Sequence, residues 1–162
     1  MALKGDDSQK AREAVFRLLA VRARSVAELD TRLKQKGFTP KIISATLADL
    51  KAKGYLDDGQ FARQFIREKF ENSGWGPARL RPELFRKGID KGLAEQLLSA
   101  FFEDRDLAAD ILPLARKRWR AWSGRPMEVR RRRLTGFLQR RGYHWDVIDQ
   151  VLEQLESVTG SD

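Results

Sequence analysis

Residues 29–38 read LDTRLKQKGF, and the pattern of this stretch recurs twice further along the chain. The second copy, LRPELFRKGI, occupies residues 80–89, and the third, LTGFLQRRGY, occupies residues 134–143. Each copy has leucines eight and four residues before a glycine, a basic residue directly before that glycine and a large apolar residue directly after it. Leucines four residues apart lie on one stripe of a helix, and helical apolar spacing continues through nearly the whole chain. The sequence therefore predicts an all-α protein built from three tandem repeats.

The glycine of each copy predicts where one helix ends and the next begins. Glycine after the last helical residue adopts the left-handed conformation without a steric penalty, and a cation just before it suits the helix C-terminus. Two residues after the glycines come the next N-cap positions, occupied by Thr39, Asp90 and His144. Upstream, Ser25 and Glu28 have the spacing of a capping box, and Gly76-Pro77 marks the equivalent start in the second copy. Each copy is therefore expected to hold three helices in a helix-turn-helix-like arrangement.

These signals give a map of helices and repeats along the chain. The expected helices are 8–24, 25–36, 40–53, 58–72, 77–87, 91–102, 106–122, 126–141 and 145–157. The expected parts are a flexible N-terminal tail (1–10), repeat 1 (11–56), repeat 2 (57–103), a basic repeat 3 (104–157) and a C-terminal tail (158–162). Short connectors favour an elongated, curved array of stacked repeats. Pro82 and Pro113 fall inside expected helices, so those helices are expected to bend or to start late.

Composition excludes several classes of function. The 162 residues contain no cysteine and one histidine, which excludes disulfides, cysteine-ligated metals, thiol nucleophiles and histidine-rich metal sites. No phosphate-binding glycine loop of the GxxxxGK[ST] or GxGxxG type is present. We therefore expect no catalytic residues, no metal and no cofactor. The polar, acid-containing N-terminus is unlike a secretion signal, and the apolar run at 97–102 is too short to span a bilayer, so we expect a soluble cytoplasmic monomer without membrane contact.

The excess of positive charge is regional, and the window that carries it lies inside the third repeat. Lysine and arginine number 32 against 23 acids, a net charge of +9 that favours polyanionic partners. Twelve bases and three acids lie between Arg105 and Tyr143, so this window carries all of the excess, and the other 20 bases and 20 acids cancel. Helical geometry points six bases outward, and these are the predicted DNA- or phosphate-binding residues: Arg116, Lys117, Arg120, Arg132, Arg133 and Arg140. Arg118 and Trp122 are expected to point inward, and Arg130 and Arg141 to lie beside the leucine stripe.

Each of these features also has a purely structural interpretation. A run of charge on a helix is often only a solvated face. Trp119 could stack on a base, although its spacing fits packing better. The Asp57-Asp58 pair resembles two catalytic carboxylates, but Asp57 and Gln60 have capping-box spacing at the start of a helix. His144 occupies a cap position, which makes it a poor candidate for a catalytic base.

Three stretches taken together resemble the RecX family of recombination regulators. They read SxxELxxxLxxKGF from Ser25, GYLDDxxFAxxF from Gly54 and GPxxLxxxLxxKGI from Gly76, and the resemblance extends over about residues 11–156. It implies a fold of tandem three-helix repeats and a bacterial modulator of the RecA recombinase. Such modulators act on the filament of RecA on single-stranded DNA, where they suppress ATP hydrolysis, strand exchange and the co-protease activity of the SOS response. The implied partners are the RecA filament and DNA, single-stranded and possibly double-stranded.

Two other functions are compatible with the sequence. A direct duplex-DNA-binding helix-turn-helix transcriptional regulator would place a winged-helix hairpin after Lys53-Gly54-Tyr55-Leu56, where the sequence instead predicts another helix at Phe61. An RNA-associated basic protein is the third class, because phosphate contacts do not distinguish between nucleic acids.

Overall fold

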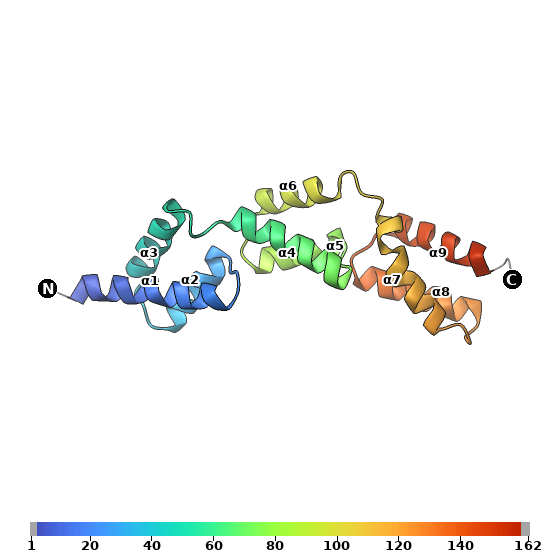
Figure 1. Cartoon of the computed structure of the whole chain (residues 1–162), viewed down its shortest axis with the longest axis horizontal. Coiled ribbons are helices and arrows are strands. Elements are labelled where there is room, and N and C mark those ends of the chain that lie inside the picture. Colours follow the sequence, from blue (N-terminus) through green and yellow to red (C-terminus); the bar gives the residue numbers. More distant parts are fainter. Residues whose placement is uncertain (1–2, 160–162) are drawn as a thin grey trace. The chain divides into compact units, whose positions relative to one another are not determined.

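The computed structural model describes residues 3–159 and is all-helical over that range (Figure 1). Three successive groups of three helices follow the three sequence copies, which confirms the predicted all-α, three-repeat fold. The helices of the described chain are α1 (Leu3–Val21), α2 (Val26–Gln35), α3 (Pro40–Ala52), α4 (Asp58–Ser73), α5 (Pro77–Arg86), α6 (Lys91–Phe102), α7 (Leu107–Ala121), α8 (Met127–Arg140) and α9 (Trp145–Thr159).

The N-terminal tail is the main difference from the expected map. Helix α1 begins at Leu3, so most of the tail expected over residues 1–10 is helical. Its polar residues carry no helix stop signal, and Lys10 forms an ion pair with Asp6 one turn earlier. Residues 1–2 of that tail, and residues 160–162 of the expected C-terminal tail, lie outside the described residues. Pro82 and Pro113 lie inside α5 and α7, and neither helix starts late.

Local capping explains why the other boundaries were predictable. The Ser25 hydroxyl accepts a hydrogen bond from the Glu28 N–H, and the Glu28 carboxylate accepts one from the Ser25 N–H, which completes the capping box. The Asp57 carboxylate accepts a hydrogen bond from the Gln60 N–H at 3.0 Å, so it caps α4. Thr39, Asp90 and Asp106 cap α3, α6 and α7 in the same way.

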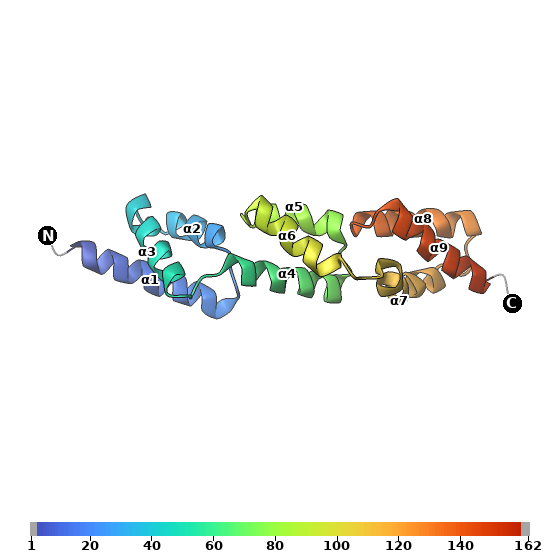
Figure 2. The same ribbon diagram turned by 90° about the horizontal axis from the view of Figure 1, so that it is seen from above.

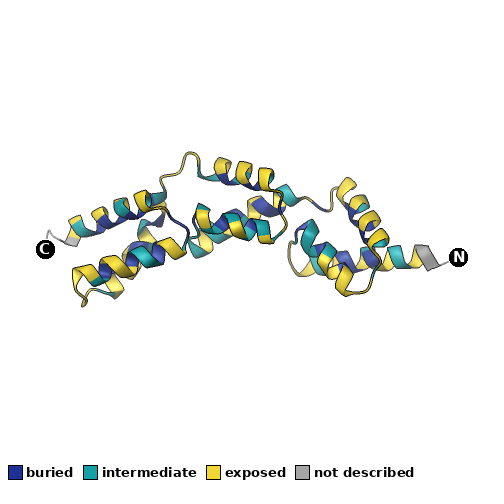
Figure 3. Cartoon of the chain, turned by 180° about the vertical axis from the view of Figure 1, so that it is seen from behind, coloured by how far each residue is buried: buried dark blue, intermediate teal, exposed yellow. Residues whose placement is uncertain are grey.

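The chain divides into two compact units. The first unit comprises residues 1–64 and 84–94, and the second comprises residues 65–83 and 95–162. In the first unit, α1, α2 and α3 contact one another around a core that includes Val15, Leu29, Leu33, Ile43 and Leu50. In the second unit, α7, α8 and α9 pack around a separate core that includes the buried leucines and Trp119 of the third copy. Figure 2 shows these three helices together, and Figure 3 colours the buried residues along them dark blue.

Two of the repeat glycines, Gly88 and Gly142, lie at the contacts between successive copies. In the first unit, the Ser25 hydroxyl donates to the Lys87 carbonyl at 2.5 Å, and a Cβ on Gly88 would lie 2.2 Å from the Ala27 Cβ. In the second unit, the equivalent Gly76 N–H donates to the Arg141 carbonyl at 2.6 Å, and a Cβ on Gly142 would lie 2.3 Å from the Arg79 nitrogen. The left-handed glycine that closes a helix therefore also allows close contact with the preceding copy.

Candidate nucleic-acid interface

All six basic residues that the sequence placed on a phosphate-binding surface are exposed. Arg116, Lys117 and Arg120 lie on α7, and Arg132, Arg133 and Arg140 lie on α8. The two helices pack against each other within the second unit, because Ala115 and Trp119 of α7 share a core with Leu134 and Leu138 of α8. Burial of these apolar stripes leaves the basic faces of both helices in solvent.

Three of these six residues line one cleft. It has a volume of about 440 Å³ and is lined by Arg118, Trp122, Arg132, Arg133, Gly136, Phe137 and Arg140, which we call the arginine cleft. The three predicted residues of α8 all line it, whereas Arg116, Lys117 and Arg120 of α7 do not. Four guanidinium groups therefore surround a partly apolar surface that contains two aromatic rings.

The position of Arg118 corrects the sequence prediction. Arg118 was expected to point inward, but its side chain is exposed and its guanidinium lies 4.9 Å from the centre of the Phe137 ring. A long cationic side chain that starts near the core can extend across an aromatic ring and keep its charged end in water. Trp122, predicted inward, is half-buried, and Arg133 lies 5.9 Å above its ring. A guanidinium stacked on a ring still presents its N–H edge to an anion.

Other bases of the third copy have structural roles. Arg130 is 7% exposed, lies 4.1 Å from the centre of the Trp119 ring, and donates a hydrogen bond to the Trp119 carbonyl at 3.1 Å. Trp119 itself is 3% exposed, which confirms that it packs in the core. Arg131 is paired with the Glu156 carboxylate at 2.9 Å. These residues stabilise the fold and do not contribute to the arginine cleft.

Arg141 connects this region to the second copy. Its guanidinium donates to the Ser73 carbonyl and lies 4.9 Å from the Phe137 ring. Burial lowers the pKa of Arg141, and the positive charges of Arg79 and Arg118 lower it further. The cations on this side of the second unit therefore repel one another, and an anion bound among them would relieve that repulsion.

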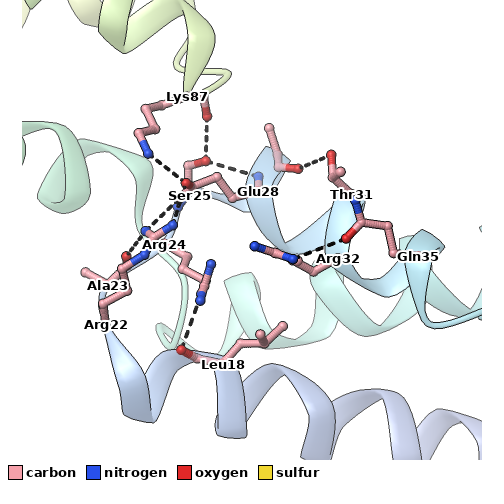
Figure 4. A network of polar contacts seen from close by, with 11 residues as sticks. Leu18, Arg22, Ala23, Arg24, Ser25, Glu28, Thr31, Arg32, Gln35 and Lys87 are labelled. Carbon is pink, nitrogen blue, oxygen red and sulfur yellow. Dashed lines mark hydrogen bonds and ion pairs between the residues drawn. The ribbon is translucent and has the colours of Figure 1, made fainter.

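The first unit holds a basic cluster that sequence reasoning missed (Figure 4). Glu28 accepts hydrogen bonds from Arg22 at 3.0 Å and from Lys87 at 2.9 Å, in addition to the Ser25 N–H. Burial alone would raise the pKa of Glu28, but these bonds outweigh it and lower the pKa to about 2. The cluster joins residues about sixty positions apart, so no motif along the chain brings its members together.

The described residues contain no cluster of metal ligands, and the Asp57-Asp58 pair is bound to the backbone. No three His, Cys, Asp or Glu side chains in residues that the structure describes lie where they could hold a metal ion. Both members of the Asp57-Asp58 pair bind backbone N–H groups, because Asp58 accepts a hydrogen bond from Val26 at 2.9 Å. Within the described range, none of the helices has the length and apolar character needed to cross a membrane.

Comparisons with known proteins agree with the three-repeat structure. Three family models match successive parts of the chain: RecX, first three-helix domain at residues 11–50, second three-helix domain at 57–98 and third three-helix domain at 106–152. A regulatory protein RecX of Chlorobium phaeobacteroides is 33% identical over 149 residues, which cover 92% of this chain and 95% of that protein. The corresponding protein of Mycolicibacterium smegmatis is 35% identical over 152 residues, covering 89% and 78% of the two chains.

Solved structures show the same fold. The crystal structure of RecX from Lactobacillus salivarius superimposes with a TM-score of 0.82 at 23% identity and covers 94% of this chain and 98% of that one. All three domain models match this chain, and the two relatives share about a third of their residues with it over most of their length. This chain therefore belongs to the RecX family of regulatory proteins.

Proposed function

We propose that this protein binds the nucleoprotein filament of RecA on DNA and inhibits RecA, and thereby modulates recombination and DNA repair. The inhibited activities are ATP hydrolysis, strand exchange and the co-protease step of the SOS response. The observation that supports this proposal most strongly is the arginine cleft, in a chain that belongs to a family of regulatory proteins. No catalytic step is assigned to the protein, so inhibition results from binding alone.

The composition of the cleft favours single-stranded DNA as the nucleic acid that it contacts. Arginine side chains bind phosphate oxygens through paired N–H groups, and such contacts hold a protein on a strand without reading its sequence. The half-buried Trp122 adds aromatic surface beside Arg132 and Arg133, and unpaired bases stack on such surface. Duplex DNA offers the same phosphates, but its bases are already stacked on each other.

The duplex-binding alternative is less well supported. A winged-helix regulator needs a β-hairpin after its recognition helix, whereas in the described chain α3 is followed by a short loop and then by α4 at Asp58. Binding to the RecA filament, bare single strand, duplex DNA and structured RNA, each at two salt concentrations, separates the three classes. Strongest binding to the filament is expected, and strongest binding to duplex DNA would favour the transcriptional regulator.

Steady-state ATP hydrolysis by RecA on single-stranded DNA tests the inhibition itself. Titration with this protein is expected to suppress hydrolysis at or below one molecule per RecA subunit. An unchanged rate across that range would rule out the proposed inhibition.

The role of the cleft is tested by the salt dependence of DNA binding. We expect Arg132→Ala, Arg133→Ala and Arg140→Ala together to weaken binding to a single strand and to reduce the log–log salt slope by about 0.7 per lost phosphate contact. The matched control replaces three exposed lysines of the first unit, Lys36, Lys41 and Lys51, with alanine and removes the same charge. An equal reduction in both variants would assign the effect to net charge.

A further inference from the structure

The first unit contains a pocket with a marked excess of positive charge. It has a volume of about 360 Å³ and lies where α2 and the end of α5 meet. Five cations and one carboxylate line it, namely Arg22, Arg24, Arg32, Arg86, Lys87 and Glu28, most of which appear in Figure 4. The groups that line the pocket therefore carry a local excess of four positive charges, within a first repeat (11–56) that holds ten lysines and arginines against four acids.

The single carboxylate of the pocket is already engaged. Glu28 is held by Arg22 and Lys87, and its side chain is 17% exposed, so it cannot turn to neutralise the other cations. Arg24 donates to the Leu18 carbonyl and Arg32 donates to Gln35, and both of these acceptors are uncharged. Burial lowers the pKa of Arg24, and the charges of Arg22 and Arg32 lower it further. The pocket thus concentrates cations whose mutual repulsion a bound anion would reduce.

The repeat supplies a second, independent observation. Arg86 stands two residues before Gly88, and Arg140, which lines the arginine cleft, stands two residues before Gly142. Lys87 and Arg141 are equivalent in the same way, and the carbonyl of each accepts a hydrogen bond from the preceding copy. A base is therefore presented at the same position of two successive repeats.

We propose that this pocket is a second anion-binding site, which holds the phosphodiester backbone of a nucleic acid. Ala27 is the single apolar residue among the described residues that line it, and none of them is aromatic. Protein-binding hot spots centre on aromatic and apolar anchors, whereas contacts to nucleic-acid backbones are polar and strongly basic. Without an aromatic ring the pocket lacks the usual platform for a base, so contact to the sugar-phosphate backbone is the expected mode of binding. That its natural occupant is the DNA of a RecA filament rests on the proposed function.

The test uses an abasic phosphodiester octamer, which carries backbone charge but no bases. Binding is measured by fluorescence anisotropy in the background Arg132→Ala, Arg133→Ala and Arg140→Ala, so that the pocket is observed without the cleft. Adding Arg32→Gln and Arg86→Gln is expected to raise the Kd roughly tenfold and to lower the log–log salt slope by about 1.4, for two lost phosphate contacts. Lys36→Gln and Lys41→Gln, which remove the same charge outside the pocket, are expected to change the Kd less than twofold.

Several outcomes would overturn the proposal. It fails if the two pairs of substitutions have equal effects, or if an octamer of glutamate competes as well as the abasic octamer, since the latter result would assign the pocket to acidic protein segments. Arg24 is left in place because it bonds to the Leu18 carbonyl, and circular dichroism checks that helix content is unchanged. The probe contains neither RecA nor bases, so failure here is distinct from failure to inhibit RecA.

Discussion

Glu28→Gln is the substitution that most sharply tests the contact between the first and second copies. Glu28 closes the capping box of α2 and also accepts hydrogen bonds from Arg22 and Lys87. Glutamine keeps the shape of the side chain but removes its charge. The structure therefore predicts a loss of stability that comes from electrostatics and that depends on pH.

The pKa of Glu28 gives the magnitude of this loss. It falls from the ordinary value of 4.5 to about 2 in the folded protein. A shift of that size corresponds to roughly 3 kcal/mol of stabilisation of the charged form, since each unit is worth about 1.4 kcal/mol. Because folding lowers this pKa, the stabilisation is present above pH 4.5 and is lost as the pH falls toward 2. At pH 3, about half of the stabilisation should have gone.

The assay has to distinguish the two units. All four tryptophans belong to the second unit, so their fluorescence follows the unfolding of that unit. Hydrogen exchange of the amides of α2 reports on the first. We expect Glu28→Gln to lower the free energy of opening of α2 by roughly 3 kcal/mol at neutral pH, with a smaller change in the fluorescence transition.

A matched control uses a carboxylate of the same unit. Glu13 is half-exposed and lies 3.7 Å from Arg17 on the surface of α1. Exposed ion pairs contribute little to stability, so Glu13→Gln should cost about 0.5 kcal/mol or less. A cost for Glu28→Gln no greater than that of this control would refute the assigned role of Glu28. So would a difference between wild type and Glu28→Gln that is as large at pH 3 as at pH 7.

Two further predictions concern the repeat and the buried arginine. Gly37→Ala and Gly88→Ala both place a side chain at positive φ, but only the second also meets Ala27. The backbone strain should cost each variant about 1.5 kcal/mol, and the clash should make Gly88→Ala the more destabilising by roughly 1 kcal/mol or more in urea unfolding followed by circular dichroism. Equal costs would mean that the copies separate easily at this contact. Arg130→Met removes the hydrogen bond and the ring contact to Trp119. It should lower the stability of the second unit by about 1.5 kcal/mol in urea unfolding followed by tryptophan fluorescence. The same variant should bind single-stranded DNA as tightly as wild type, and weaker binding would move Arg130 into the interface.

The helix boundaries could be predicted because the signals that set them are local. Glycines 37, 88 and 142 have the positive φ that their place after a helix predicts, and Ser25 and Asp57 cap the helices that follow them. Each signal involves residues only a few positions apart. The sequence does not predict the start of α1, because a helix exposed to solvent needs no apolar stripe until it meets its neighbours at Ala11 and Val15.

The residues of a candidate site could be predicted only where they lie on one face of a single helix. Arg132, Arg133 and Arg140 share α8, and helical periodicity alone placed them in solvent. The predicted inward orientation of Arg118 was wrong. Helical periodicity determines the direction in which a side chain leaves the backbone, but not where the charged end of a long side chain lies. The pocket in the first unit joins a loop, α2 and the end of α5, and no pattern along the chain connects these segments before the copies stack.

Site-specific crosslinking measures directly whether the α7–α8 surface contacts the DNA of the RecA filament. A photoreactive residue replaces Gln139, which is exposed and lies two helical turns after Arg132 on the same face of α8, so every arginine is retained. The control position is Glu153, which is exposed on α9. On a filament assembled with labelled single-stranded DNA, we predict crosslinks to DNA from position 139 and not from position 153. Crosslinks from position 139 to RecA alone, or equal labelling from both positions, would mean that this surface does not hold the DNA.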